Sequence, residues 1–518
     1  MPNDERKRPV TTTGHAVARA EVSDTDAGSA DQLLVSLGYT PELSRNRSTL
    51  QVAFMSFVLA SIPYGLATTL YYPLVGGGPV NIIWGWVAVS AIILCVAASL
   101  GEITSVYPTA GGVYYQTFML APPEWRRIAA WTCGWLYVVG NVTITLAVNF
   151  GTTLFLVGCI NVFDPEDAQG VLAGEPYQVF LIFLGITLLC NAVSSLCNKW
   201  LPILDTFAIF WTFAGVIAIM VCVLAIAKQG RHDASWVFTH FEANSGWTPG
   251  WSFIVGLLHA AYATSSTGMI ISMCEEVRAP ATQVPKAMVL TICINTVAGL
   301  MFMIPLVFVL PDIQGLIVLT QPVPAIVKSA VGDPGGAFGL LIPLLVLAII
   351  CGIGCTTAAS RCVYAFARDG AIPGSNWWKQ IDHRLDDVPL NAMMLSMVVQ
   401  IVLGVIYFGS SAAFNAFSGV GVIALTASYA TPIVVSMLSG RKTVQTASFK
   451  LGALGWFCNI VATCWSLLAI PLFCMPTVVP VVDPSTMNYA SVVFFAFTLI
   501  SIGWYVVWGR KHYTGPPT

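Results

Sequence analysis

Charged side chains are scarce in this chain of 518 residues, since Asp, Glu, Lys and Arg together make up 9% of it. An ordinary soluble domain carries about 25%. The net charge is −2 and the pI is near 6.3, so the chain lacks the basic surface that binds nucleic acid. Hydrophobic residues, by contrast, make up 56%. This composition excludes an ordinary soluble protein and indicates one that lies in a lipid bilayer.

Other absences concern chemistry. The chain has no phosphate-binding loop of the GxxxxGK[ST] kind, which argues against the use of ATP by this chain alone. Its 14 cysteines and 6 histidines show no metal-ligand spacing. No nucleophile, base and orienting group can be assembled from its motifs, so we predict no enzyme and no cofactor. Cys159 and Cys474 lie near the outer ends of apolar stretches, so one disulfide between them is possible from the sequence.

Apolar stretches are long and numerous. A bilayer core of about 30 Å needs roughly 20 apolar residues per helix. Twelve stretches meet this requirement, at Leu50–Leu74, Asn81–Val106, Arg127–Val157, Gln178–Leu196, Ile203–Ala227, Trp251–Glu275, Ala287–Leu310, Gly336–Ala365, Leu390–Phe408, Ala413–Leu438, Gly452–Cys474 and Ala490–Trp508. They predict an all-α integral membrane protein with twelve transmembrane helices and no soluble domain.

The order of the stretches suggests two repeats. The first five (50–227) and the next five (251–438) form two halves, and an odd number of helices per half inverts the second relative to the first. Residues 452–508 hold two additional helices, so that the twelve-helix domain covers 48–508. Residues 1–47 are polar and lack the apolar run of a signal peptide, which predicts a disordered cytoplasmic tail. Residues 509–518 form a short second tail.

The orientation follows from the basic residues, because Lys and Arg stay on the cytoplasmic side. With the N-terminus inside, the outer loops hold only Lys228, Arg231 and Lys328 of the 23 basic residues. The loop from Asn161 to Tyr177 carries four acidic residues and no basic one. Both termini are therefore predicted to be cytoplasmic.

Two stretches are interrupted at matching places in the two halves. Non-helical backbone survives in hydrocarbon only where it lines a cavity enclosed by protein. A pair of such breaks is the best sequence pointer to a transporter's substrate site. We expect a half-helix starting near Leu66 to direct its positive N-terminal end at an anionic group. The predicted substrate-binding residues are Ser61, Ile62, Pro63, Tyr64 and Gly65 in the first break, and Ala263, Thr264, Ser265, Ser266 and Thr267 in the second.

Each break also has a plainer interpretation. Pro63 alone is as well explained by an ordinary proline kink, and hydroxyls in a helix often bond back to the preceding turn. The coincidence of the two breaks favours a cavity. Tyr64 and Tyr262 could hold an amine by cation–π attraction worth about 2 kcal/mol when desolvated, or could simply pack. We favour a substrate contact for Tyr64 and leave Tyr262 open.

Ionisable residues at membrane depth are costly and are therefore functional candidates. His259 lies about one turn before the second break and is a candidate for proton exchange, although a lone histidine is more often structural. Glu102, Asp205, Glu275 and Glu276 lie near the inner ends of their stretches. We expect them to form cytoplasmic gate contacts with Arg361, Arg368 or Lys286 rather than to touch substrate.

Three motifs resemble those of the amino acid–polyamine–organocation superfamily of permeases. They are Glu102 followed by Tyr107-Pro108-Thr109-Ala110-Gly111-Gly112-Val113-Tyr114, then Glu275-Glu276-Val277 with Pro280 and Pro285, and finally Ser360-Arg361 with Tyr364-Ala365-Phe366-Ala367-Arg368-Asp369-Gly370 and Pro373. They stand in order among the twelve spans and cover nearly the whole chain beyond the first tail. Within the superfamily the chain looks closest to the fungal GABA, choline and general amino-acid permeases.

The resemblance implies a leucine-transporter-type fold with alternating access. It implies that the backbone of 61–65 binds the substrate carboxylate and that 263–267 face the amine. It also implies that Arg368 and Asp369 hold the inner ends of helices together. Several fungal members of the family carry an acidic residue at the position that matching the Glu-Glu motif without gaps gives to Gly268. The absence of that acid here favours amino acids, or a cation held by aromatic rings, over polyamines.

The function implied is therefore proton-coupled secondary transport of an amino acid or amine such as GABA or choline. The small molecule, the co-transported proton and the lipid bilayer are the expected partners, and family resemblance favours the plasma membrane. A facilitative exchanger with the same site remains an alternative. A sensor that binds without transporting is another, although only ten residues follow Trp508.

Overall fold

The computed structural model describes residues 28–43, 45, 47–164, 172, 174–409, 413–482 and 487–517. These residues form helices and no β-sheet beyond two isolated bridges. Twelve helical segments within them are long and apolar enough to cross a membrane, as the sequence predicts. They are Gln51–Thr68, Asn81–Val106, Arg126–Phe163, Pro176–Leu196, Asn198–Ile226, Pro249–Glu276, Pro280–Phe308, Pro334–Arg368, Leu390–Phe408, Asn415–Leu438, Leu454–Leu472 and Ala490–His512.

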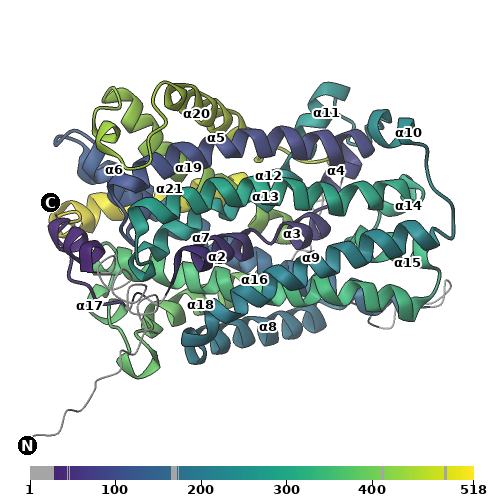
Figure 1. The fold of residues 1–518 in the computed structure, drawn as a ribbon, viewed down its shortest axis with the longest axis horizontal. Helices are drawn as coiled ribbons and strands as arrows, with labels where there is room; N and C mark the ends of the chain where they lie inside the picture. The colour runs from purple at the N-terminus through teal and green to yellow at the C-terminus, as the bar shows by residue number, and fades with distance from the viewer. Residues whose placement is uncertain are drawn as a thin grey trace, which may run out of the picture.

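The helices run nearly parallel to the long axis of the molecule (Figure 1). The principal ones are α2 (Thr49–Ala60), α3 (Ile62–Thr68), α4 (Tyr71–Gly76), α5 (Trp86–Val106), α7 (Arg126–Ile160), α8 (Pro176–Leu196), α9 (Leu201–Ile226), α11 (Pro249–Gly256), α12 (Leu258–Thr264), the 3₁₀ helix η4 (Ser265–Glu276), α13 (Pro280–Phe308), α16 (Pro334–Arg368), α18 (Leu390–Gly404), α19 (Ala413–Leu438), α20 (Leu454–Leu472) and α21 (Ala490–Trp504). Short helices join them, among them α6 (Gly112–Leu120), α10 (Ala234–Thr239), α14 (Ile313–Leu316), α15 (Pro322–Val331), α17 (Ser375–Trp378) and α22 (Arg510–His512).

Equivalent helices of the two halves pack against each other. α5 packs on α13, α7 on α16, and α8 on α18, and these are the second, third and fourth helices of each half. The division into two repeats of five helices, with α20 and α21 as the two additional ones, stays a prediction. α20 packs on α5 and α19, and α21 packs on α19 and α7.

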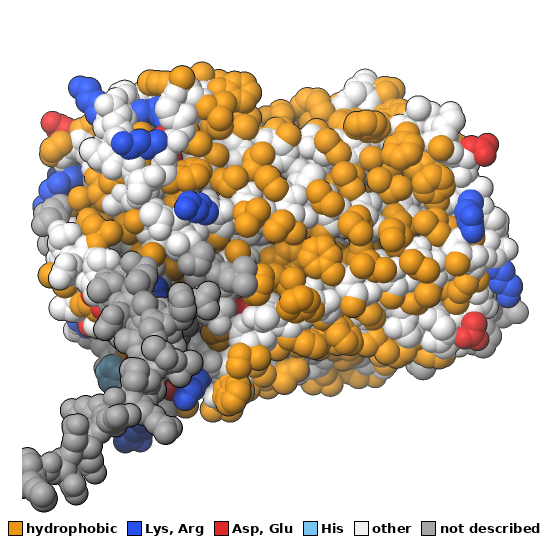
Figure 2. Space-filling view, viewed as in Figure 1, with side chains coloured by type: hydrophobic (Ala, Val, Ile, Leu, Met, Phe, Trp, Pro, Cys, Tyr) orange, Lys and Arg blue, Asp and Glu red, His pale blue; other side chains and the backbone are white. Residues whose placement is uncertain are grey.

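Hydrophobic side chains cover the middle of the face drawn in Figure 2, whereas the charged side chains on this face lie near its two ends. A bilayer requires this distribution, because a charge at its centre is costly. The end that carries α6, α17 and the last residues is called the terminal end below, and the end that carries α10, α14 and α15 is called the far end (Figure 1).

The two breaks are narrower than the sequence suggested. In the first, Ser61 alone leaves the helix, at φ 38° and ψ 50°, and α3 begins at Ile62 rather than near Leu66. Residues 62–65 are therefore helical, because the left-handed turn at Ser61 makes Ile62 and Pro63 the first residues of α3, where proline is tolerated. In the second break, residues 263–267 remain helical. The α-helix α12 ends at Thr264, and the chain continues directly as the 3₁₀ helix η4, whose turns are tighter.

The prediction of a disordered tail over residues 1–47 does not hold for the described residues in that range, and residues 1–27 lie outside them. Residues 28–36 are helical and Arg47 forms an isolated bridge with Val277. The C-terminal segment is packed as well. Tyr513 is buried against Trp131, and a Cβ added at Gly38 would lie only 2.6 Å from Pro517 Cβ. The segment before the first span and the C-terminal segment are therefore in contact at the terminal end.

Candidate functional site

A cavity of about 280 Å³ lies between the two broken spans. Five of the ten predicted substrate-binding residues line it, namely Tyr64, Gly65, Ala263, Ser265 and Ser266. Gly65 and Ala263 bring the spans together, since a Cβ added at Gly65 would lie 3.3 Å from Ala263 Cβ.

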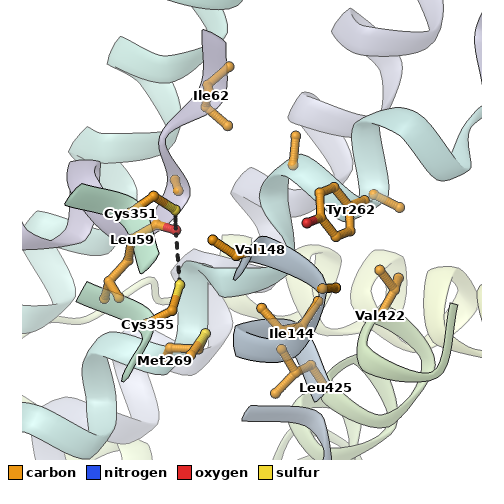
Figure 3. Close-up of a cluster of buried hydrophobic side chains, with 14 of the residues drawn as sticks. Leu59, Ile62, Ile144, Val148, Tyr262, Met269, Cys351, Cys355, Val422 and Leu425 are labelled. Atoms are coloured by element: carbon orange, nitrogen blue, oxygen red, sulfur yellow. Dashed lines mark hydrogen bonds between the residues drawn. The ribbon is translucent and has the colours of Figure 1, made fainter. Parts of the chain in front are cut away.

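Ser61, Ile62 and Pro63 shape the cavity without lining it. The left-handed turn at Ser61 frees the Leu59 carbonyl from the helix, and the thiols of Cys351 and Cys355 on α16 donate to it at 3.7 and 4.0 Å (Figure 3). The Ser61 hydroxyl donates back to the Val58 carbonyl. Sequence reasoning missed both cysteines, because only the folded chain brings α16 beside the break.

A second cavity, of about 420 Å³, lies on the other side of Ser265. Thr264, Thr267 and Gly268 line it together with Tyr429 and Trp465. The hydroxyls of Thr264, Ser265 and Thr267 all donate to the preceding turn, as the plainer interpretation expected. Their lone pairs remain available to a ligand. None of the residues that line either cavity is an acid or a base other than tyrosine and cysteine.

The two tyrosines at the breaks differ in their hydroxyl partners. The Tyr64 hydroxyl lies 2.8 Å from both the Val148 carbonyl and the Thr152 hydroxyl, which holds its ring edge-on to Phe155. Tyr262 lines the same cavity, and its hydroxyl is buried and has no partner among the described residues. A buried hydroxyl without a partner costs about 1–3 kcal/mol. Tyr262, which the sequence left open, is therefore the better candidate for a polar contact with substrate.

His259 is connected to the first break. Thr69 donates to the Gly65 carbonyl at 2.8 Å, and His259 Nδ1 lies 3.0 Å from the same hydroxyl oxygen. Because that hydroxyl hydrogen is already used, Nδ1 carries the proton and donates to Thr69. Nε2 is buried and has no partner within the described part of the chain. His259 lines neither of the two cavities.

Four buried charges form a chain of ion pairs at the terminal end. Glu276 lies 2.7 Å from Arg361 and 3.5 Å from Arg47, and Arg47 lies 2.7 Å from Asp205. All four side chains are buried, so each charge depends on its partners. These ion pairs join η4, α16 and α9 to Arg47, which lies two residues before α2. Sequence reasoning placed Arg47 in a disordered tail and so missed it.

The three sequence motifs meet beside these ion pairs. Glu275 receives two hydrogen bonds from Arg368, at 2.9 and 3.0 Å, and a third from the Ala110 amide at 2.9 Å. Asp369 accepts from the hydroxyls of Tyr114 and Tyr39. The motif around 107–114, the Glu-Glu pair and the Arg-Asp pair are thus in contact although they are far apart in the sequence.

Glu102 pairs with a partner that the sequence did not suggest. It accepts from Arg441 and, at 3.0 Å, from the Leu451 amide, both in the segment between α19 and α20. Of the three bases expected to meet the acidic residues, Arg361 and Arg368 do so. Lys286 is exposed and forms no ion pair with a described residue.

Burial raises the pKa of Asp369 to about 6, against the opposing effects of Arg368 and of the hydroxyls of Tyr114 and Tyr39. An unfolded Asp loses its proton near pH 4, so between about pH 4 and 6 the folded chain binds more protons than the unfolded one. The stabilisation is present below pH 4 and is lost as pH rises through 6. We expect Asp369→Asn to flatten the fall in melting temperature over this range, whereas Asp312→Asn, at an exposed site, should leave it unchanged. An identical pH profile for Asp369→Asn would contradict this.

Comparison with known proteins agrees with this architecture. Residues 48–497 match the family model described as amino acid permease, and the chain therefore belongs to the amino acid permease family. It is similar to the amino-acid permease BAT1 of Arabidopsis thaliana, with 29% identity over 93% of this chain and 95% of the relative. It is also similar to the choline transporter of Saccharomyces cerevisiae (30% identity; 91% and 83% covered) and to the polyamine transporter TPO5 of the same yeast (28%; 88% and 74%). The chain is thus a multi-pass membrane transporter and not an enzyme.

Proposed function

We propose that this permease carries a small amino acid of the GABA type, as a zwitterion, by alternating access through the cavity between the broken spans. The observation that carries the proposal is the lining of that cavity, which offers hydroxyls and backbone but no charged side chain. Moving a polyamine with several charges into such a site would be costly, because a buried charge needs a partner. A zwitterion carries no net charge and needs only hydrogen-bond partners for its two ends.

In this proposal the Tyr262 hydroxyl donates to the substrate carboxylate. This hydroxyl has no partner among the described residues, and Tyr262 lines the cavity. The hydroxyl oxygens of Ser265 and Ser266 then face the ammonium group as acceptors. The backbone beside Ser61 completes the site, as the family resemblance implies.

The proposal is tested by uptake of labelled GABA into permease-deficient yeast that express this chain, with excess unlabelled choline as competitor. Uptake that choline does not suppress supports a carboxylate-binding permease. Absence of GABA uptake at verified surface expression, together with saturable choline uptake, would overturn it and favour the choline-like alternative, in which aromatic faces such as that of Tyr64 hold the cation.

Tyr262→Phe should raise the KM for GABA about 10-fold or more with little change in the amount of protein at the surface. The reason is that a hydrogen bond to a charged group contributes about 1.5–3 kcal/mol. Tyr64→Phe is the matched control, because the Tyr64 hydroxyl already bonds to Val148 and Thr152. Equal KM values for the two variants would contradict the assignment of Tyr262.

We further propose that the ion pairs at the terminal end are the cytoplasmic gate, that both termini are cytoplasmic, and that the membrane is the plasma membrane. A proton would be exchanged at His259, whose free Nε2 and link to Gly65 support that role. Collapse of the proton gradient should then abolish accumulation. Equilibration that persists at full rate and to the same level would instead favour the facilitative exchanger, and binding without any flux would favour a sensor.

Glu102→Gln should lower the maximal rate several-fold and leave the KM nearly unchanged. Glu102 lines neither cavity and holds the segment between α19 and α20 against α5 through Arg441 and the Leu451 amide. Removing one charge weakens a contact that must break and re-form in each cycle. Glu124→Gln, an exposed site near the same end, is the control. An unchanged rate in both variants would mean that Glu102 serves the fold alone.

A further inference from the structure

An indole ring is held between two imidazole rings at the far end. Trp236 on α10 stacks on His232 with ring centroids 3.7 Å apart and planes 15° apart, and on His240 with centroids 4.8 Å apart and planes 17° apart. His232 and His240 flank α10 (Ala234–Thr239), and the two ring contacts bring all three side chains together. All three rings border a hollow of about 930 Å³ and remain partly exposed. Solvent protons can therefore reach them.

The segment that carries this stack, residues 228–248, is called the far-end cap. It is tied to α4 and to the residue that follows it: the Asn244 amide donates to the Val75 carbonyl at 2.9 Å, and the Glu242 amide donates to the Gly77 carbonyl at 3.3 Å. It is also tied to the end of α13, where the His232 amide donates to the Phe308 carbonyl at 2.8 Å and His232 Nε2 donates to the Leu310 carbonyl at 2.7 Å. The cap thus joins α4, which follows the first break, to α13.

Charged groups surround the stack. Glu242 Oε2 lies 3.4 Å from His240 Nε2. Hydrogen bonds from Asn244 and Gln314 to Glu242 lower the pKa of that carboxyl, so it is ionised when the imidazole takes up a proton. Asp312 lines the same hollow and Asp233 precedes α10. Arg231 also lines the hollow, and Lys228 lies against Gly332. Residues 75–84 contribute no charged side chain.

We infer that the far-end cap is a proton-sensitive brake on transport, with the His232–Trp236–His240 stack as its sensor. Histidine changes charge between pH 5 and 8, and a cation stacked on an indole face is held more firmly than a neutral ring. Protonation therefore tightens the cap and ties α4 to α13. Release on the alkaline side frees α4 to move with α11, against which it packs. The inference that the stack senses protons depends only on the geometry of the three rings. The inference that it affects transport also depends on the proposed alternating access.

The sensor is tested first without any substrate. A protonated imidazole quenches a stacked indole, so the emission of purified wild-type protein minus that of Trp236→Phe reports on Trp236 alone. We expect this difference to fall by at least half between pH 8 and 5, and to stay flat in His232→Gln/His240→Gln. His383→Gln, at an exposed histidine paired with Asp387, should behave as wild type. A flat difference in the wild-type protein, or an unchanged transition in the double variant, overturns the sensor.

The brake is tested by the ratio of uptake at pH 5 to uptake at pH 8. The double variant is expected to raise this ratio two- to threefold over wild type, and His383→Gln to leave it unchanged. An unchanged ratio in the double variant, with the fluorescence transition present in wild type, overturns the coupling to transport. If the wild-type chain takes up none of the tested solutes, the fluorescence titration still decides the sensor, so the two failures are distinguishable.

Discussion

Replacing Gly65 with leucine is expected to reduce uptake to background while the protein remains at the cell surface. The Cβ alone would lie 3.3 Å from Ala263 Cβ and 3.4 Å from Ala263 Cα, which is closer than most side-chain contacts. The rest of a leucine would then have to enter the cavity of about 280 Å³ that Gly65 lines. Overpacking of this kind costs about 1–3 kcal/mol even where the surroundings shift, and here the shift would separate the two broken spans.

The control for this variant is Gly185→Leu. Gly185 lies on α8, is exposed, and has no atom within 4 Å of an added Cβ. The Gly185→Leu variant should reach the cell surface and should take up substrate at the wild-type rate. Uptake by Gly65→Leu at a rate comparable with that of Gly185→Leu would show that the cavity is not the site. Gly65→Ala is an informative intermediate, since it adds only the contact with Ala263, and we expect partial activity.

Replacing Arg361 with glutamine is expected to destabilise the protein by about 3–5 kcal/mol, the usual cost of leaving a buried charge without its partner. Arg361 is fully buried and its Nε lies 2.7 Å from Glu276. Without it, Glu276 keeps only Arg47, at 3.5 Å, and Arg47 is already paired with Asp205. The cluster then holds two acids and one base in a buried place. A lower melting temperature in detergent and less protein at the surface are the expected readouts.

Lys286→Gln provides the matched control, because it removes one positive charge on α13, close to the same end of the molecule. Lys286 is exposed and has no ion pair among the described residues, so its loss should change the melting temperature little. If the two variants melt at the same temperature, the ion-pair chain contributes no more than an exposed lysine does. Glu276→Gln/Arg361→Gln should be less damaging than Arg361→Gln alone, since it removes both buried charges of that pair.

Patterns of local composition predicted the features that depend on the solvent around the chain. An apolar stretch of about 20 residues has to be a spanning helix in lipid, because only helices satisfy every backbone polar group within one segment. The twelve spans could therefore be read from the sequence to within a few residues at most ends. The same reasoning located the two breaks, since Pro63 and the hydroxyls at 264–267 stand out against their apolar surroundings.

Features that depend on contacts between distant segments were not predictable in the same way. The two groups that bond to the Tyr64 hydroxyl lie on α7. Tyr64 and Tyr262 are the same type of residue, and they differ only in whether the hydroxyl has such a partner among the described residues. Arg47 and Arg441 lie in polar segments whose composition indicates tail and loop, yet each is buried against an acid more than 150 residues away in the chain. The thiols that face the first break lie on α16.

The sequence by itself therefore determined that this protein is a twelve-span membrane protein with paired breaks and permease motifs, because hydrophobicity and backbone pairing act within one segment. The tertiary structure decided which side chains line the cavity, which charges neutralise one another at the terminal end, and that the segment before the first span is packed rather than free. A buried charge or hydroxyl is stable only with a partner, and the partner is chosen by packing between segments that lie far apart in the chain.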